Sequence, residues 1–232
     1  MAYRIALIGG GGVGKSTLAF AFSNYLAKKG LSTGVANLDP GCKHIKYDAF
    51  FDIRKHYTLD KVMKKERLGP NGALKKIYSD CAANSKMRSQ IKNTKADIVL
   101  LDTAGSLELF LLEGAADFLK KTSDAVLFIT DNESADKKID LTMLKAINAM
   151  QTLRYTLPTI TVINKSDLIE KKRVKQKKLT GGFQAVDEHL KRMLEEIGGS
   201  QPVLFVSAWE RTGFGSLFQA INELKCACGD HS

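Results

Sequence analysis

The sequence predicts an α/β fold in which helices cover both faces of a mostly parallel sheet. Apolar, β-branched segments alternate with amphipathic segments along most of the 232 residues, and this alternation is typical of strands joined by helices. Several strands read as nearly continuous apolar runs, such as IVLL at 98–101 and AVLFI at 125–129. Such runs are expected where a parallel strand is buried on both faces.

Six strands are predicted from these apolar and β-branched runs. Their ranges are Tyr3–Ile8, Ser32–Asp39, Asp97–Asp102, Ala125–Thr130, Thr159–Asn164 and Val203–Ser207. Five helices are predicted from the amphipathic segments between and after them. Their approximate ranges are Lys15–Lys29, Ser106–Lys121, Lys137–Leu153, Phe183–Ile197 and Ser216–Lys225.

Residues 41–95 interrupt this alternation between the second and third predicted strands. They contain two helical-looking pieces, Leu59–Glu66 and Ala73–Asn84. We expect an insertion carried by the sheet, inside a single domain that spans residues 1–232. The last residues, 226–232, are expected to be a frayed tail.

The net charge of +10 is unevenly distributed. Fourteen Lys and Arg stand against five Asp and Glu between Lys43 and Lys95, and six basic residues stand against one acid in 170–178. Such clusters favour anionic partners, including nucleic acid, although a solvated basic surface is the alternative. Neither cluster has the interleaved aromatic residues of a platform for single strands. Nucleic-acid binding through the insertion therefore stays open.

No apolar run is long enough to span a bilayer. The N-terminal apolar run ends in glycines rather than in a cleavage site, so it is interpreted as a strand and not as a signal peptide. The cysteines at 42, 81, 226 and 228 lack the spacing of a disulfide framework. A cytoplasmic protein with free thiols is the simplest expectation.

Residues Gly9–Ser16 read GGGGVGKS directly after the first predicted strand and before the first helix, which is the pattern of a P-loop. Glycines let backbone N–H groups curl around phosphates, Lys15 would reach the β- and γ-phosphates, and the Ser16 hydroxyl would bind Mg²⁺. The sequence therefore predicts a P-loop NTPase. The residues of this loop expected at the nucleotide are Gly11, Gly12, Val13, Gly14, Lys15, Ser16 and Thr17.

Two acids stand at the carboxyl ends of predicted strands. Asp102 begins DTAG, and Asp39 lies in NLDPG. Carboxyl ends of parallel strands share one crevice, where an acid supports Mg²⁺ in P-loop enzymes. The predicted metal-binding residues are therefore Ser16, Asp39 and Asp102, although Asp39 also reads as a turn-forming residue. Gly105 leaves its N–H free to meet the γ-phosphate.

A guanine site is predicted after the fifth strand. Asn164, Lys165 and Asp167 form N-K-x-D, in which the carboxylate can accept hydrogen bonds from guanine N1–H and N2–H₂. Adenine would leave this acceptor unpaired, so such a site discriminates strongly. Ser207 and Ala208 follow the last strand, where a backbone N–H can meet guanine O6. The order of these motifs favours GTP over ATP.

The insertion carries the tripeptide Gly69-Pro70-Asn71 between NLDPG and DTAGSLELF. In this context the chain resembles the GPN-loop GTPases over Gly9–Ala208. The resemblance implies a homodimer or heterodimer of the SIMIBI class, in which each GPN loop reaches the partner's nucleotide. Asn71 would then contact the γ-phosphate or the attacking water in trans.

The chain departs from the family pattern beside the γ-phosphate. Family members usually have DTPGQ, followed after one residue by Glu, whereas this chain has DTAGS, Leu107 and Glu108. Ser106 therefore replaces the Gln that positions water, while Glu108 could orient the nucleophile. We expect a Mg²⁺-dependent GTPase with slow hydrolysis. Its catalytic residues would be Asp39, Asn71, Asp102, Ser106 and Glu108.

The resemblance also implies a nucleotide-dependent switch or assembly factor, with a client such as the RNA polymerase machinery. Three alternatives remain open. Cys42 and His44 resemble the Cys-x-His of nickel metallochaperone GTPases, and Cys226 with Cys228 could form another metal cluster. A GTP-binding scaffold with little hydrolysis is the third. A partition ATPase fits poorly, because Gly10 stands where that class has a second lysine.

Overall fold

The computed structural model describes residues 2–111, 115–131, 138–168, 185–186, 188–190, 192–193 and 203–229. Within these residues, seven strands form one sheet in the order β3-β2-β4-β1-β5-β6-β7, with every neighbouring pair parallel. The strands are β1 (Tyr3–Ile8), β2 (Thr33–Leu38), β3 (Ala49–Asp52), β4 (Ile98–Thr103), β5 (Ala125–Asp131), β6 (Thr159–Asn164) and β7 (Val203–Phe205). The predicted α/β fold is confirmed.

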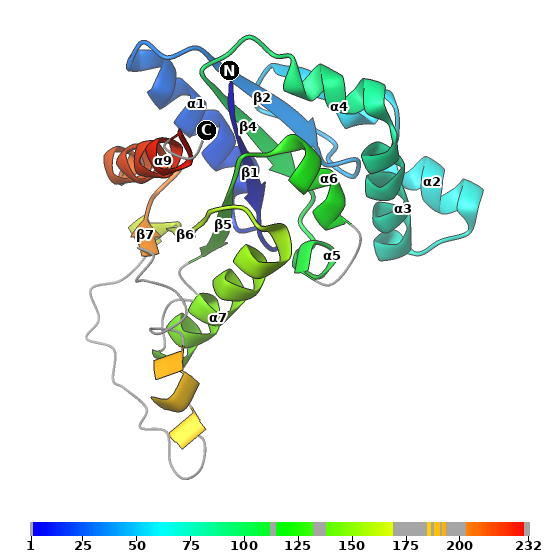
Figure 1. Cartoon of the computed structure of the whole chain (residues 1–232). Coiled ribbons are helices and arrows are strands. Elements are labelled where there is room, and N and C mark those ends of the chain that lie inside the picture. Colours follow the sequence, from blue (N-terminus) through cyan, green and yellow to red (C-terminus); the bar gives the residue numbers. More distant parts are fainter. Residues whose placement is uncertain are drawn as a thin grey trace.

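Helices cover both faces of this sheet (Figure 1). One face carries α1 (Lys15–Lys28) and α9 (Phe214–Gly229). The other face carries α3 (Pro70–Ala83), α4 (Ser85–Lys92), α6 (Ala115–Thr122) and α7 (Lys138–Tyr155). Further helical segments are η1 (Ile53–Lys55), α2 (Leu59–Glu66), α5 (Leu107–Leu111) and η3 (Ser166–Leu168).

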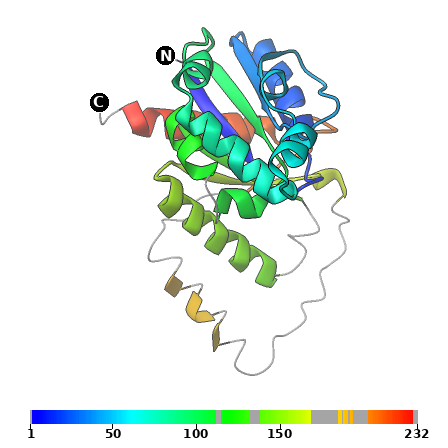
Figure 2. The ribbon, with the colours of Figure 1, turned by 90° about the vertical axis from the view of Figure 1, so that its right-hand side faces the viewer.

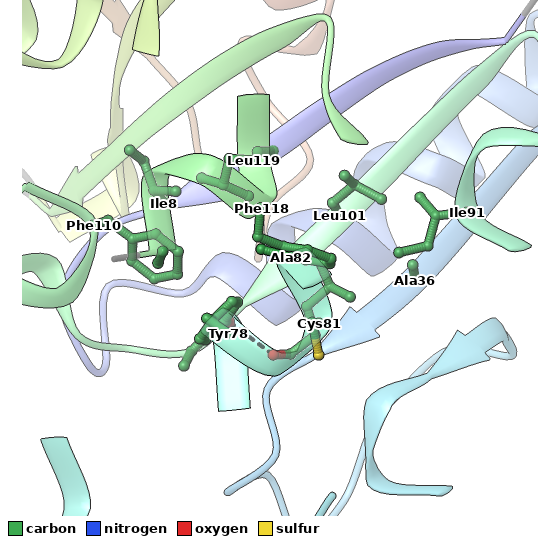
Figure 3. Close-up of a cluster of buried hydrophobic side chains, with 14 of the residues drawn as sticks. Ile8, Ala36, Tyr78, Cys81, Ala82, Ile91, Leu101, Phe110, Phe118 and Leu119 are labelled. Atoms are coloured by element: carbon green, nitrogen blue, oxygen red, sulfur yellow. Dashed lines mark hydrogen bonds between the residues drawn. The ribbon is translucent and has the colours of Figure 1, made fainter. Parts of the chain in front are cut away.

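Alternation along β1 divides the core into two clusters. Ala6 and Ile8 belong to the cluster under α3 and α6, whereas Ile5 and Leu7 belong to the cluster under α1 and α9. Successive side chains of a strand point to opposite faces, so one apolar strand supplies both cores. Figure 3 shows part of the first cluster, in which Tyr78 of α3 lies close to Ala82.

The strand order reverses at β1, which pairs with β4 on one side and β5 on the other. Leu7 pairs in register with Asp102, and Asp102 pairs with Asn37 of β2. Because all strands are parallel, their carboxyl ends meet at the same edge of the sheet. This reversal is where open α/β sheets bind ligands.

The segment 41–95 contains more structure than the sequence predicted. Both expected helical pieces are present, as α2 and α3, but β3 and α4 were not predicted. β3 has only four residues, AFFD, and its mixed burial gives no clear alternation. In Figure 2, which faces α3, these helices lie in front of the sheet.

Two other predictions differ from the structure, and a third is described only in part. The helix predicted at Ser106–Lys121 is two helices, α5 and α6, and residues 112–114 between them lie outside the described part. Most of the helix predicted at Phe183–Ile197 lies outside the described part, and its described residues, 185–186, 188–190 and 192–193, are helical. Residues 226–229, expected to fray, continue α9, and 230–232 are not described. Within the described residues, no helix is long and apolar enough to cross a membrane.

Candidate nucleotide and magnesium site

The P-loop turns sharply into α1 at Gly14. This residue has φ 92°, a left-handed conformation that favours glycine. A Cβ at Gly14 would also lie 2.4 Å from Nδ2 of Asn164. Both the backbone angle and the close approach therefore require glycine, and the turn aims the N-terminus of α1 at the loop.

Lys15 is enclosed by the P-loop, with only 6% of its surface exposed. Its Nζ donates to the carbonyl of Gly9 at 3.1 Å and to that of Gly10 at 2.8 Å. Burial lowers the pKa of Lys15, while the carboxylates of Asp102 and Asp39 oppose this shift. The ammonium thus lies within the field of both predicted magnesium acids.

Asp102 is 1% exposed, at the end of β4. Its Oδ2 accepts a hydrogen bond of 2.6 Å from the hydroxyl of Tyr47, whereas its buried Oδ1 makes no hydrogen bond of normal geometry. Burial raises the pKa of Asp102, and the hydroxyls of Tyr47 and Ser16 and the ammonium of Lys15 counteract this. A buried carboxylate oxygen without a partner is costly.

A divalent cation would satisfy this oxygen. Mg²⁺ prefers oxygen ligands and keeps several waters when bound to a nucleotide. The Ser16 hydroxyl and the free Oδ1 of Asp102 are such ligands, so the residues present fit a magnesium ion.

Asp39 lies in a tight turn near Asp102. Its Oδ1 accepts the backbone N–H of Gly41 at 2.8 Å, and its own N–H donates to the Asn37 side chain. The turn-forming role considered from the sequence is therefore present. The carboxylate of Asp39 is also close enough to Lys15 to act on its charge, which places Asp39 near the proposed magnesium site.

Gly105 brings the segment after β4 directly onto the P-loop. A Cβ at Gly105 would lie 2.9 Å from the Cα of Gly11 and 3.6 Å from Nζ of Lys15. Any larger residue would push the two loops apart. Ser106 follows this contact and is half-buried, while Glu108 is exposed in the first turn of α5.

The base-binding motifs are joined to the P-loop by Asn164. Its Nδ2 donates to the carbonyl of Val13 at 2.9 Å, and its Oδ1 accepts the backbone N–H of Ala208 at 3.0 Å. The side chain is 2% exposed. One carboxamide therefore braces three loops.

The other two residues of the motif, Lys165 and Asp167, each contact a different residue of the site. Asp167 is exposed, and its Oδ1 accepts a hydrogen bond from the buried hydroxyl of Ser207. Lys165 has φ 59°, uncommon for lysine, and its Nζ lies 3.2 Å from Oδ2 of Asp131. The arrangement orients the Asp167 carboxylate and holds the lysine stem beside it.

The GPN tripeptide is placed differently from all the residues above. Gly69 caps α3, Pro70 occupies its first turn, and Asn71 follows. Residues 67–71 are all exposed. Among the described residues, no hydrogen bond joins Asn71 to the P-loop. The structure brings together the P-loop, the two acids and the base motifs, but does not bring Asn71 to its own chain's site.

Sequence reasoning missed two polar residues of the site. Asp131 stands at the carboxyl end of β5, and the rule that selected Asp102 could have found it. Tyr47 belongs to no strand or helix, so no periodicity marks it. Only its hydrogen bond to Asp102 identifies Tyr47 as a residue of the site.

The alternative metal sites gain no support from the described residues. The residues that the structure describes contain no group of three or more His, Cys, Asp or Glu able to hold a metal ion. Cys42 Sγ donates to the carbonyl of His44, and burial raises the pKa of the thiol, which disfavours the thiolate.

Comparison with known proteins agrees with this geometry. Residues 7–227 match a family described as a conserved hypothetical ATP binding protein. The GPN-loop GTPase PAB0955 of Pyrococcus abyssi is 29% identical, over 97% of this chain and 98% of that protein. GPN-loop GTPase 3 of Saccharomyces cerevisiae is 31% identical, over 75% of this chain and 67% of that protein.

The apo crystal structure of the Pyrococcus abyssi GTPase superposes with a TM-score of 0.83 at 26% identity, covering 97% of this chain and 98% of that one. The family description names ATP, whereas these relatives are named GTPases. A carboxylate at the position of Asp167 suits guanine, because adenine lacks the paired N1–H and N2–H₂ donors that guanine would offer it.

Proposed function

Since the chain belongs to the GPN-loop GTPases, we propose that it hydrolyses GTP slowly as a Mg²⁺-dependent homodimer. In this proposal each subunit supplies Asn71 to its partner's nucleotide. The GTP and GDP states would then differ in dimer geometry, which suits a nucleotide-dependent switch or assembly factor.

The exposed start of α3 carries the proposal. Asn71 sits in the first turn of a 14-residue helix whose preceding residues, from Arg67, are also exposed. A carboxamide can donate to a phosphate oxygen and accept from water. The positive end of the helix favours an approaching phosphate. An exposed position of this kind suits contact with the nucleotide of a second subunit.

The remaining residues act from within the chain. Lys15 and the P-loop amides would hold the β- and γ-phosphates, and Ser16, Asp39 and Asp102 would hold Mg²⁺, which neutralises charge on the phosphates when bound. Water attacks the γ-phosphorus as the bond to the β–γ bridging oxygen breaks, and this yields GDP and phosphate. Tyr47 keeps the Asp102 carboxylate oriented.

Dilution tests the proposal without any substitution. Phosphate release from GTP should require Mg²⁺ and stop in EDTA. The rate per subunit should fall as the protein is diluted below its dimer dissociation constant, because each site loses its trans residue. Sedimentation at the same concentrations would locate that constant. A rate per subunit that stays constant while dimers dissociate would overturn the trans arrangement.

Ser106 is expected to limit the rate. A Ser106→Gln substitution should raise kcat, by roughly tenfold, because the longer side chain can hold the attacking water with more contacts. GDP affinity should not change, because Ser106 lies beyond the Gly105 contact with the P-loop. Single-turnover phosphate release and GDP titration measure the two quantities. An unchanged rate would show that Ser106 is not limiting.

A further inference from the structure

The hydroxyl of Tyr78 connects α3 to two strand ends of the nucleotide site. It donates to the carbonyl of Leu38 at 2.8 Å and accepts the backbone N–H of Ala104 at 3.2 Å. Leu38 directly precedes Asp39, and Ala104 directly precedes Gly105. One phenol therefore holds the backbone beside a proposed magnesium acid and beside the proposed γ-phosphate contact.

The ring of Tyr78 is held firmly. It is 0% exposed and packs edge-on against Phe110, with centroids 5.3 Å apart, and against Phe118, at 5.8 Å. Figure 3 shows these rings close to one another in the first core cluster. Interiors this well packed have little free volume. A shift of either strand end must therefore move α3 or break a hydrogen bond.

The same helix carries Asn71. Tyr78 follows Asn71 by seven residues, which is two turns, so the two lie on similar faces about 10 Å apart along the axis. α3 is continuous between them. A displacement at Tyr78 thus reaches Asn71 through a rigid element.

The link to the segment after β4 depends on the residue at position 104. Ala104 is 2% exposed, so its N–H needs a partner, and the Tyr78 hydroxyl is that partner. Proline at this position would have no N–H to donate. The residue at 104 therefore decides whether α3 is tied to this segment.

We propose that Tyr78 is a positioning residue that transmits the presence of the γ-phosphate from Gly105 to α3 and so orients Asn71. The inference rests on the trans role proposed for Asn71. The coupling itself lies inside one chain and can be measured without the partner's site.

Hydrogen exchange of residues 59–83 tests it, with the protein loaded with Mg²⁺ and either GDP or a non-hydrolysable GTP analogue. The wild-type protein should exchange more slowly in the analogue state. Tyr78→Phe should reduce this difference about fivefold or more, because both hydrogen bonds are lost. kcat should fall similarly, while GDP affinity should stay within about twofold.

Tyr155→Phe is the matched control. Tyr155 is also fully buried, and its hydroxyl donates to a backbone carbonyl, that of Phe110, but to neither strand end. This variant should keep the nucleotide-dependent difference. Ala104→Pro is a second variant, which removes the N–H donated to Tyr78 and keeps the bond from Tyr78 to Leu38, and it should lose the difference as Tyr78→Phe does.

Three results would overturn the coupling: no difference in the wild-type protein, a full difference in Tyr78→Phe or Ala104→Pro, or its loss in Tyr155→Phe. If Tyr78→Phe does not fold, Ala104→Pro decides. Failure of the trans role appears separately, as a rate per subunit unaffected by dilution. Asn71→Ala should keep the exchange difference, which distinguishes the two failures.

Discussion

Mixing an Asn71→Ala chain with a Lys15→Ala chain is expected to restore GTP hydrolysis that neither chain performs alone. Each parent homodimer lacks one essential group in both of its sites. In a mixed dimer, one site combines the intact P-loop of the first chain with Asn71 of the second. Its other site lacks both groups.

The expected effect is large. A donor that acts on the transferring phosphoryl group contributes roughly 10²–10³ in kcat, and more in some GTPases. Each parent should therefore turn over at about 1% of the wild-type rate or less. With equal amounts and free exchange, half of the dimers are mixed and each has one intact site, so about a quarter of the wild-type rate should return.

The measurement is steady-state phosphate release after the chains have exchanged, with differently tagged chains to quantify mixed dimers. A mixture of wild-type chains with a chain that carries both substitutions is the control for exchange, because both sites of that mixed dimer are damaged and free exchange should lower the rate from about half to about a quarter of the wild-type rate. Mixed dimers that are present in the expected amount but show no recovered activity would rule out action in trans.

Asp167→Asn is expected to weaken GTP binding by roughly two to three orders of magnitude. The carboxylate would accept two hydrogen bonds from guanine, and bonds to a charged group are worth about 1.5–3 kcal/mol each. Asparagine presents an amide N–H₂ to a base edge that is itself a donor. Xanthosine triphosphate carries an oxygen in place of the guanine N2 amine, so its relative affinity should rise.

Trp209 offers a direct readout of this change. It is the only tryptophan, is 80% exposed, and directly follows Ala208. Its fluorescence during titration with GTP, ATP and xanthosine triphosphate should give the relative affinities. Ser207→Ala is the matched control, since it removes the hydrogen bond to Asp167 but keeps the carboxylate, and should cost only a few-fold. An unchanged base preference in Asp167→Asn would place the base elsewhere.

The strands and the nucleotide motifs were predictable because their signals are local. A parallel strand buried on both faces must be apolar along its length, and phosphates demand glycine turns followed by a lysine. Asp102 and Asp167 could be proposed as site residues because strand ends of a parallel sheet converge. β3 was missed because its four residues, which differ in burial without a clear alternation, carry too little periodicity.

The sequence by itself determined the fold class, the P-loop and the preference for guanine, since each depends on residue types at short spacing. Only the tertiary structure decided that Tyr47 orients Asp102, that Asn164 braces three loops, and that Tyr78 ties α3 to two strand ends. These contacts join residues far apart in the chain. Their existence depends on packing, because burial leaves each polar atom only the partners that the fold places beside it.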